Sequence, residues 1–210
     1  MKRLLTIFIF ILSLNIVTFS QDFAKRGTWE LGGSVGFMST TGVSAGTSDP
    51  AATTTFSFSP EAGYFITDNF ELALLPFSIS TGSTPNFTYH VQNNQIVVTT
   101  TTTTTTSFRF LIAPTWNFDI QSNIYPYIQV LIGYGTESFK NDTPYPDGYD
   151  YSVSGLDYGA QAGIKIQVAK SSILNLGVSY LMTSREQSGE TSRFGNNIFQ
   201  IMAGFSVFIR

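Results

Sequence analysis

The stretch LDYGAQAGIKIQV, Leu156 to Val168, decides the fold of this chain because its alternate residues differ in chemistry. In an extended strand, successive side chains point to opposite faces. The first face is apolar and carries Leu156, Tyr158, Ala160, Ala162, Ile164, Ile166 and Val168. The second face is polar or small and carries Asp157, Gly159, Gln161, Gly163, Lys165 and Gln167. A membrane strand would turn the first face to lipid and the second into a barrel, whereas a soluble sheet would turn the first face inward.

Composition favours the membrane alternative. Charged residues make up 12% of the chain, about half of the roughly 25% that is usual for soluble domains. The chain has no cysteine, which excludes a disulfide framework and a lipid-modified N-terminal cysteine. It has 14 acidic and 11 basic residues, and it lacks the basic surface of a nucleic-acid-binding protein.

The first twenty residues have the pattern of a cleaved secretory signal. Lys2 and Arg3 precede an apolar run, and small residues lie near Ser20. We therefore predict a signal peptide at residues 1–20 and a mature β-barrel domain at 21–210, which begins at Gln21. An N-terminal membrane helix is the alternative, but the apolar run is shorter than a full span. Loss of Lys2 and Arg3 leaves 9 basic against 14 acidic residues, a net charge of about −5.

Alternation of the same kind recurs along the mature chain and predicts eight strands. They are expected at residues 27–38, 56–64, 70–79, 108–118, 127–135, 156–168, 174–182 and 199–209. Four prolines lie inside these strands or directly before their first residues, and because proline removes a hydrogen-bond donor we expect bulges there: Pro60, Pro76, Pro114 and Pro126. Near Leu75-Pro76 the alternation itself slips, which also indicates a bulge.

The connections between the predicted strands alternate between long and short. Short turns are expected at 67–69, 119–123 and 169–172. Outer-membrane barrels have short periplasmic turns and long external loops, and an even strand number places both termini in the periplasm. Aromatic residues beside the short turns and chain ends predict a girdle at the lipid interface: Trp29, Tyr64, Phe70, Trp116, Phe118, Tyr125 and Phe208, with Phe65 and Tyr127 beside them.

This pattern resembles the small eight-stranded outer-membrane barrels of the OmpX type and the barrel half of OmpA, the outer membrane protein beta-barrel domain family. The resemblance covers residues 27–210 and implies a Gram-negative outer-membrane protein of the broad porin class. Such barrels usually end in an aromatic residue, whereas this chain ends Phe208-Ile209-Arg210.

The inward-facing ionisable residues are the first candidate site. They are Glu30, Glu61, Glu71, Arg109, Asp157 and Lys165. An eight-stranded barrel is just wide enough for its own side chains, so we expect these groups to pair as a polar plug. A narrow ion or solute path is the alternative.

Two further groups of residues are candidates for chemistry. His90 is the only histidine, and a lipid-modifying enzyme would need it beside a serine; we expect an exposed loop residue and no catalytic residues. Glu137, Asp142, Asp147 and Asp150 form an acidic cluster that could hold calcium, although a solvated acidic loop is favoured. We expect no metal and no cofactor.

The stretch at 87–106, centred on Asn93-Asn94, predicts a hairpin that rises beyond the membrane through the threonine run 99–106. Exposed strand edges can add a partner's strand, and the extended strands of OmpX-like proteins imply the same role. We therefore expect a monomeric, non-enzymatic outer-membrane barrel that contacts lipid, plugs its own interior, and acts structurally or through its external loops, with no nucleic-acid partner. An OmpW-like channel or uptake protein for small or hydrophobic molecules is the functional alternative, and a soluble lipocalin-like barrel the architectural one.

Overall fold

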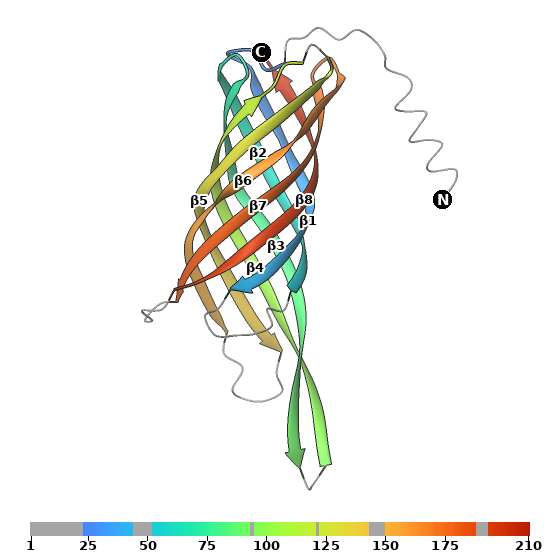
Figure 1. The fold of residues 1–210 in the computed structure, drawn as a ribbon, viewed down its shortest axis with the longest axis vertical. Helices are drawn as coiled ribbons and strands as arrows, with labels where there is room; N and C mark the ends of the chain where they lie inside the picture. Colours follow the sequence, from blue (N-terminus) through green and yellow to red (C-terminus); the bar gives the residue numbers. More distant parts are fainter. Residues whose placement is uncertain (1–22, 44–51, 93–94, 121, 143–149, 188–192) are drawn as a thin grey trace, which may run out of the picture.

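The protein is a closed barrel of eight antiparallel strands (Figure 1). The computed structural model describes residues 23–43, 52–92, 95–120, 122–142, 150–187 and 193–210. Each strand pairs with the next, and β8 pairs with β1. The strands are β1 (Trp29–Val43), β2 (Ala52–Thr67), β3 (Phe70–Gln92), β4 (Gln95–Asn117), β5 (Ile124–Asp142), β6 (Tyr151–Ala169), β7 (Ser172–Gln187) and β8 (Arg193–Ile209). The predicted all-β, up-and-down barrel is confirmed. No helix in these ranges is long and apolar enough to span a membrane.

The two ends of the barrel differ, as the spacing of the strands predicts. Tight connections join β2 to β3, β4 to β5 and β6 to β7 at one end, which we call the turn end. The C-terminus lies at this end too (Figure 1). At Asn69 the turn after β2 takes a left-handed backbone with φ of 69°, a conformation that asparagine tolerates. The other ends of the strands lie at the opposite end, which we call the open end, where β3 and β4 project as a ribbon beyond the barrel (Figure 1).

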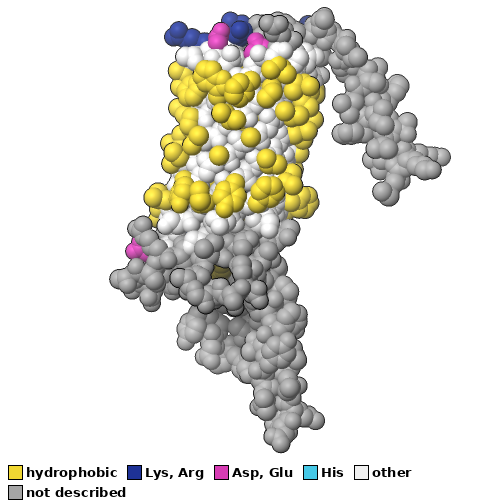
Figure 2. Space-filling model, viewed as in Figure 1, with side chains coloured by type: hydrophobic (Ala, Val, Ile, Leu, Met, Phe, Trp, Pro, Cys, Tyr) yellow, Lys and Arg dark blue, Asp and Glu magenta, His cyan; other side chains and the backbone are white. Residues whose placement is uncertain are grey.

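The wall of the barrel is apolar outside and polar inside. Within β6, Leu156 is 58% exposed, whereas its neighbour Asp157 is fully buried. Hydrophobic side chains cover the middle of the barrel, and charged side chains gather at the turn end (Figure 2). A lipocalin-like barrel would have the reverse arrangement, so the soluble alternative is contradicted.

The predicted bulge in β3 is confirmed. The pairs Leu75 with Leu111 and Ser78 with Arg109 leave Pro76 and Phe77 opposite the single residue Phe110. The extra residue exchanges the two faces, so that Leu75 and Ser78 both point inward. The β2–β3 register shifts across the same stretch.

The other prolines differ in their surroundings. Pro60 lies within the irregular part of the β2–β3 pairing. Bulges at Pro114 and Pro126 were expected and are not found. The pairing of β4 with β5 is interrupted at Pro114, but the register is the same on both sides of it. Pro126 lies just before Tyr127, the first residue of β5 that pairs with β4, so its missing N–H interrupts no ladder bond between them. On the other side it pairs with Ile164 of β6 in unbroken register.

Candidate functional site

The barrel interior near the turn end is organised around Lys165 of β6. Its Nζ lies 2.7 Å from Glu30 Oε2 of β1 and 2.8 Å from Glu71 Oε2 of β3. All three side chains are almost completely buried. Ser206 Oγ donates a further hydrogen bond of 2.6 Å to Glu30 Oε1. The structure thus joins three of the six predicted interior residues in one ion-pair cluster, the lysine cluster.

Glu61 of β2 lies beside the lysine cluster and is half-buried. Its Oε1 accepts a hydrogen bond of 3.1 Å from Gln129 Nε2, which also donates to Thr115 Oγ1 at 2.8 Å. Nearby, Gln161 Nε2 donates to the Tyr127 hydroxyl at 2.8 Å. Among the described residues, Glu61 is therefore held by the amide of Gln129, whereas Lys165 forms its ion pairs with Glu30 and Glu71.

A second cluster, the arginine cluster, lies toward the open end. Arg109 Nη2 and Arg185 Nη2 are each 3.2 Å from Glu137 Oε1. Both guanidinium groups also form ion pairs with Asp157, at 3.4 Å from Arg109 Nε. Gly135 of β5 makes room for this arrangement, because a Cβ there would lie 2.5 Å from Asp157 Oδ2 and 2.8 Å from Arg185 Nη2.

Two members of the arginine cluster differ from the sequence predictions. Glu137 was assigned to a loop and to a possible calcium site, but it lies in β5 with its side chain inside the barrel. Arg185 lies outside the strand predicted at 174–182, but it belongs to β7 and is fully buried. In both strands the alternation continues beyond the predicted end, so extending it would have found both residues.

The acidic loop has no metal site in the described part of the chain. Asp150 is exposed, Asp147 lies outside the described residues, and the side chain of Asp142 is likewise not described. Glu137 is held by two arginines, which removes it from the proposed calcium ligands.

An apolar layer separates the two charged clusters. On β4, Leu111 and Ala113 lie between Arg109 and Thr115. Gly159 of β6 pairs with Leu131 of β5 on one side and with Leu181 of β7 on the other. Gly159 leaves room for them, since a Cβ there would lie 2.8 Å from Leu181 Cα. The buried members of this layer are Met38, Ala73, Leu75, Leu111, Ala113, Leu131, Leu181 and Ile198.

An aromatic cap closes the turn end beneath the lysine cluster. Phe23, in the segment that precedes β1, is 1% exposed. Its ring centroid lies 5.2 Å from that of Phe65, 5.0 Å from Tyr125 and 5.4 Å from Phe208. Lys165 Nζ lies 5.4 Å from the centre of the Phe23 ring, within the range of a cation–π contact.

This cap corrects part of the predicted girdle. Tyr125 and Phe208 were assigned to this girdle, with Phe65 and Tyr127 beside it, but all four are buried inside the barrel. Each lies on the inward face of its strand, so the alternation overrides the general preference of aromatic residues for the interface. The other predicted girdle residues lie at the turn end: Trp29, Tyr64, Trp116 and Phe118 are exposed and Phe70 is half-buried.

The cap is also tied to the turn after β2. Asn69 N donates to Ala24 O at 2.7 Å, and Gly27 N donates to Phe65 O at 2.9 Å. Arg26 N donates to Asp68 Oδ1 at 2.9 Å, and this hydrogen bond holds the pKa of Asp68 below its usual range. Sequence analysis missed the cap, because a single phenylalanine before the first strand has no periodicity.

His90 lies on β3 in the ribbon, where its backbone pairs with that of Val97. The predicted hairpin at 87–106 is confirmed as the paired ends of β3 and β4. The side chain of His90 is not described, and residues 1–20 lie outside the described residues.

Taken level by level, the interior is filled by the aromatic cap, the lysine cluster, the apolar layer and the arginine cluster. A cavity beside Glu61 and Gln129 has a volume of about 10 Å³, which is roughly the space of one water molecule. The described side chains therefore fill the interior of the barrel and leave no continuous path through it for water or solutes.

No family model and no curated protein sequence matches this chain. Solved structures do match. Neisserial surface protein A is 14% identical with a TM-score of 0.59, over 87% of this chain and 99% of its own. Ail, the attachment invasion locus protein of Yersinia pestis, crystallised with the heparin analogue sucrose octasulfate, is 12% identical with a TM-score of 0.53, over 88% of this chain and 99% of its own. The chain therefore has the fold of the small eight-stranded outer-membrane β-barrels.

Proposed function

We propose that this protein is a non-enzymatic barrel of the outer membrane, closed by its own side chains, which acts at the cell surface through the ribbon of β3 and β4. The filled interior carries the first part of this proposal. Arg109, Arg185 and Lys165 are all engaged by buried carboxylates, so the charges that would line a conducting path are held in pairs.

Conductance tests the closed interior. The purified barrel in a planar bilayer is expected to give no unitary current. A defined single-channel current would favour the alternative of a narrow channel or uptake protein.

The free edges of the ribbon support a role in binding. In the described part of the chain, β2 pairs with β3 only as far as Thr81, and β5 pairs with β4 only as far as Thr102. Beyond these residues the two strands pair with each other alone. Residues 82–106 contain no Asp, Glu, Lys or Arg and only one proline, Pro85. Natural edge strands are usually protected by charge, proline or a covering element, so this ribbon is suited to strand addition by an external protein.

Paired proline variants test strand addition. In an antiparallel ribbon, successive residues direct their N–H groups to opposite sides, so one of Thr99→Pro and Thr100→Pro removes a bond to β3 and the other alters only the outer edge. We expect the outer-edge variant to lose the partner while the barrel remains heat-modifiable on gels. Photo-crosslinking groups at Tyr89 and Val98 should capture the partner, whereas one at Lys140 should not.

The charge of the open end argues against a polyanionic partner. The described strand ends there carry Asp142, Asp150 and Glu186 against Lys140 and Arg193, and the sequence that links these strands adds Asp49, Asp147 and Glu190. A sulfated sugar of the kind bound to Ail is therefore not expected here. A neutral or basic protein segment suits this end better.

We further propose that the turn end and both termini face the periplasm. The chain has no cysteine, so single cysteines report orientation without background. A membrane-impermeant maleimide added to intact cells should label Lys140→Cys and leave Lys170→Cys unlabelled until the outer membrane is opened. The reverse labelling would overturn the orientation.

A further inference from the structure

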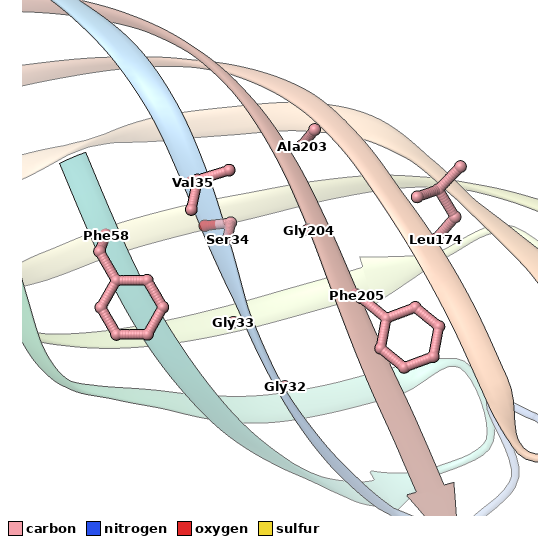
Figure 3. A pocket seen from close by; sticks show the side chains of 9 residues that line it. All are labelled: Gly32, Gly33, Ser34, Val35, Phe58, Leu174, Ala203, Gly204 and Phe205. Carbon is pink, nitrogen blue, oxygen red and sulfur yellow. The ribbon is translucent and has the colours of Figure 1, made fainter. Parts of the chain in front are cut away.

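A groove of about 500 Å³ opens on the outer wall of the barrel, where β1 closes against β8. Gly33 of β1 and Ala203 of β8 form its floor. Phe58 and Val35 border it on one side, and Phe205 and Leu174 on the other (Figure 3). The lining is therefore apolar, with bulky side chains around two small ones.

The groove is a fixed property of the backbone at this seam. Gly33 pairs with Pro60 on β2 and with Phe205 on β8. A Cβ on Gly33 would lie 3.1 Å from Ser59 O and 3.2 Å from Pro60 Cα, tighter than an ordinary contact. The glycine thus lets β1 approach β2 closely, and no rotamer change fills the space above it.

Basic side chains lie at the turn end of β7 and β8, the strands that carry Leu174 and Phe205. Lys170 lies in the turn between β6 and β7, two residues before Ser172, and Arg210 directly follows β8; both are exposed. The two strand ends are adjacent, because Phe208 N donates to Ser171 O at 2.9 Å. Arg26 is exposed at this end as well, while Lys25 pairs with Asp68. Figure 2 shows lysine and arginine side chains gathered there.

The spacing of the groove and the basic residues matches one lipid in one leaflet. Phe205 and Arg210 are five residues apart on the chain, or about 17 Å along an extended strand, which a strand tilt of about 40° reduces to about 13 Å along the barrel axis. Half the hydrocarbon thickness of a bilayer is about 15 Å. A chain lying in the groove therefore places its headgroup at the level of Lys170 and Arg210.

We propose that this seam binds one phospholipid of the leaflet at the turn end, with an acyl chain in the groove and the headgroup phosphate at Lys170 and Arg210. This inference rests on the proposed insertion of the barrel in a membrane. The groove is continuous with the apolar band, and the basic residues complement a phosphate. A second copy is a poorer occupant, because a two-fold contact at the seam would face one concave surface with another.

Native mass spectrometry of the barrel, released from membranes in a mild detergent, tests the site. The wild-type protein is expected to retain one phospholipid. Ala203→Phe fills the groove from an exposed position and should lose the adduct. Ala160→Phe, a matched change at an exposed outward position on β6, should keep it. Lys170→Glu should weaken retention, whereas Lys140→Glu at the other end should not.

Folding and insertion are followed separately by heat-modifiable gel mobility. If wild type fails to insert, the proposed membrane barrel fails; if it inserts and Ala203→Phe and Ala160→Phe retain lipid equally, only the lipid site fails. A phospholipid with a photoreactive acyl chain should crosslink chiefly to β1 and β8. Even labelling around the barrel, an adduct with the mass of lipid A, or a crosslink between copies at Ala203 would each overturn the site.

Discussion

At the scale of single residues, Lys165 has the largest influence on the interior. It holds two buried carboxylates within 2.8 Å and faces the ring of Phe23 in the cap. Buried ion pairs contribute little net stability compared with apolar packing, but loss of one partner leaves uncompensated charge. Lys165 therefore stabilises the barrel chiefly by neutralising the buried carboxylates of Glu30 and Glu71.

Replacement of Lys165 by methionine should destabilise the barrel by about 3–5 kcal/mol, since it leaves two carboxylates without their cation. The free energy of unfolding is measured by urea titration in lipid vesicles with tryptophan fluorescence. Lys170→Met, on the exposed rim, is the matched control and should change little. The triple variant Lys165→Met, Glu30→Gln, Glu71→Gln should recover most of the loss; no recovery would mean that packing rather than charge is responsible.

Asp68 should titrate below an ordinary aspartate, whose pKa is about 3.9, because Arg26 N–H stabilises its charged form. Since the folded-state pKa is the lower one, the contact stabilises the fold at neutral pH and is lost as the pH falls through the folded pKa. The Arg26 amide resonance in NMR spectra should report this titration. In Asp68→Asn the same resonance should not titrate with this midpoint.

The face on which each side chain lies could be predicted from the alternation of polar and apolar residues, but the partner of each side chain could not. The alternation placed Glu30, Glu71, Asp157 and Lys165 on inward faces, where they are buried. The partners of each charge depend on how far the strands are staggered around the barrel, and this stagger leaves no local trace in sequence. Lys165 and Glu30 are paired although 135 residues separate them.

At the scale of elements, β3 shows how one extra residue keeps a long strand correctly oriented. Pro76 and Phe77 together oppose Phe110, so the inward face passes from Leu75 to Ser78 without reversing the rest of the strand. The slip in the alternation predicted this bulge. The longer extents of β5 and β7 were missed because charged residues near a strand end resemble a loop until the ion pairs are known.

Deletion of Phe77 should therefore be tolerated, because it leaves Pro76 alone opposite Phe110 and preserves the faces of every other residue in β3. Deletion of Ala73, only four residues earlier, should prevent folding, since it turns Glu71 or Leu75 toward lipid. Heat-modifiable mobility after outer-membrane fractionation distinguishes the two variants. Equal behaviour of both deletions would contradict the role given to the bulge.

At the scale of the whole molecule, closure is repeated at several levels along the barrel axis. The aromatic cap, the two charged clusters and the apolar layer each occupy the bore. Loss of the side chains at one level therefore does not open a path through the barrel, because the next level still blocks it.

Phe23→Ala should accordingly lower the stability of the barrel without making it conduct. Loss of a buried phenylalanine ring costs about 3–5 kcal/mol, which urea titration measures. Planar-bilayer recordings of the same variant should remain silent, because the lysine cluster and the apolar layer stay in place. A unitary current from this single variant would show that the cap alone closes the barrel.

The seat of Phe23 also has a consequence for the order of assembly. Its ring contacts one aromatic residue each from β2, β5 and β8, so the seat does not exist until the first and last strands have met. Docking of Phe23 is therefore expected among the final steps of folding, after the ring of strands is complete. Burial of the Phe23 ring therefore reports that the barrel has closed, because its three aromatic contacts come together only in the closed barrel.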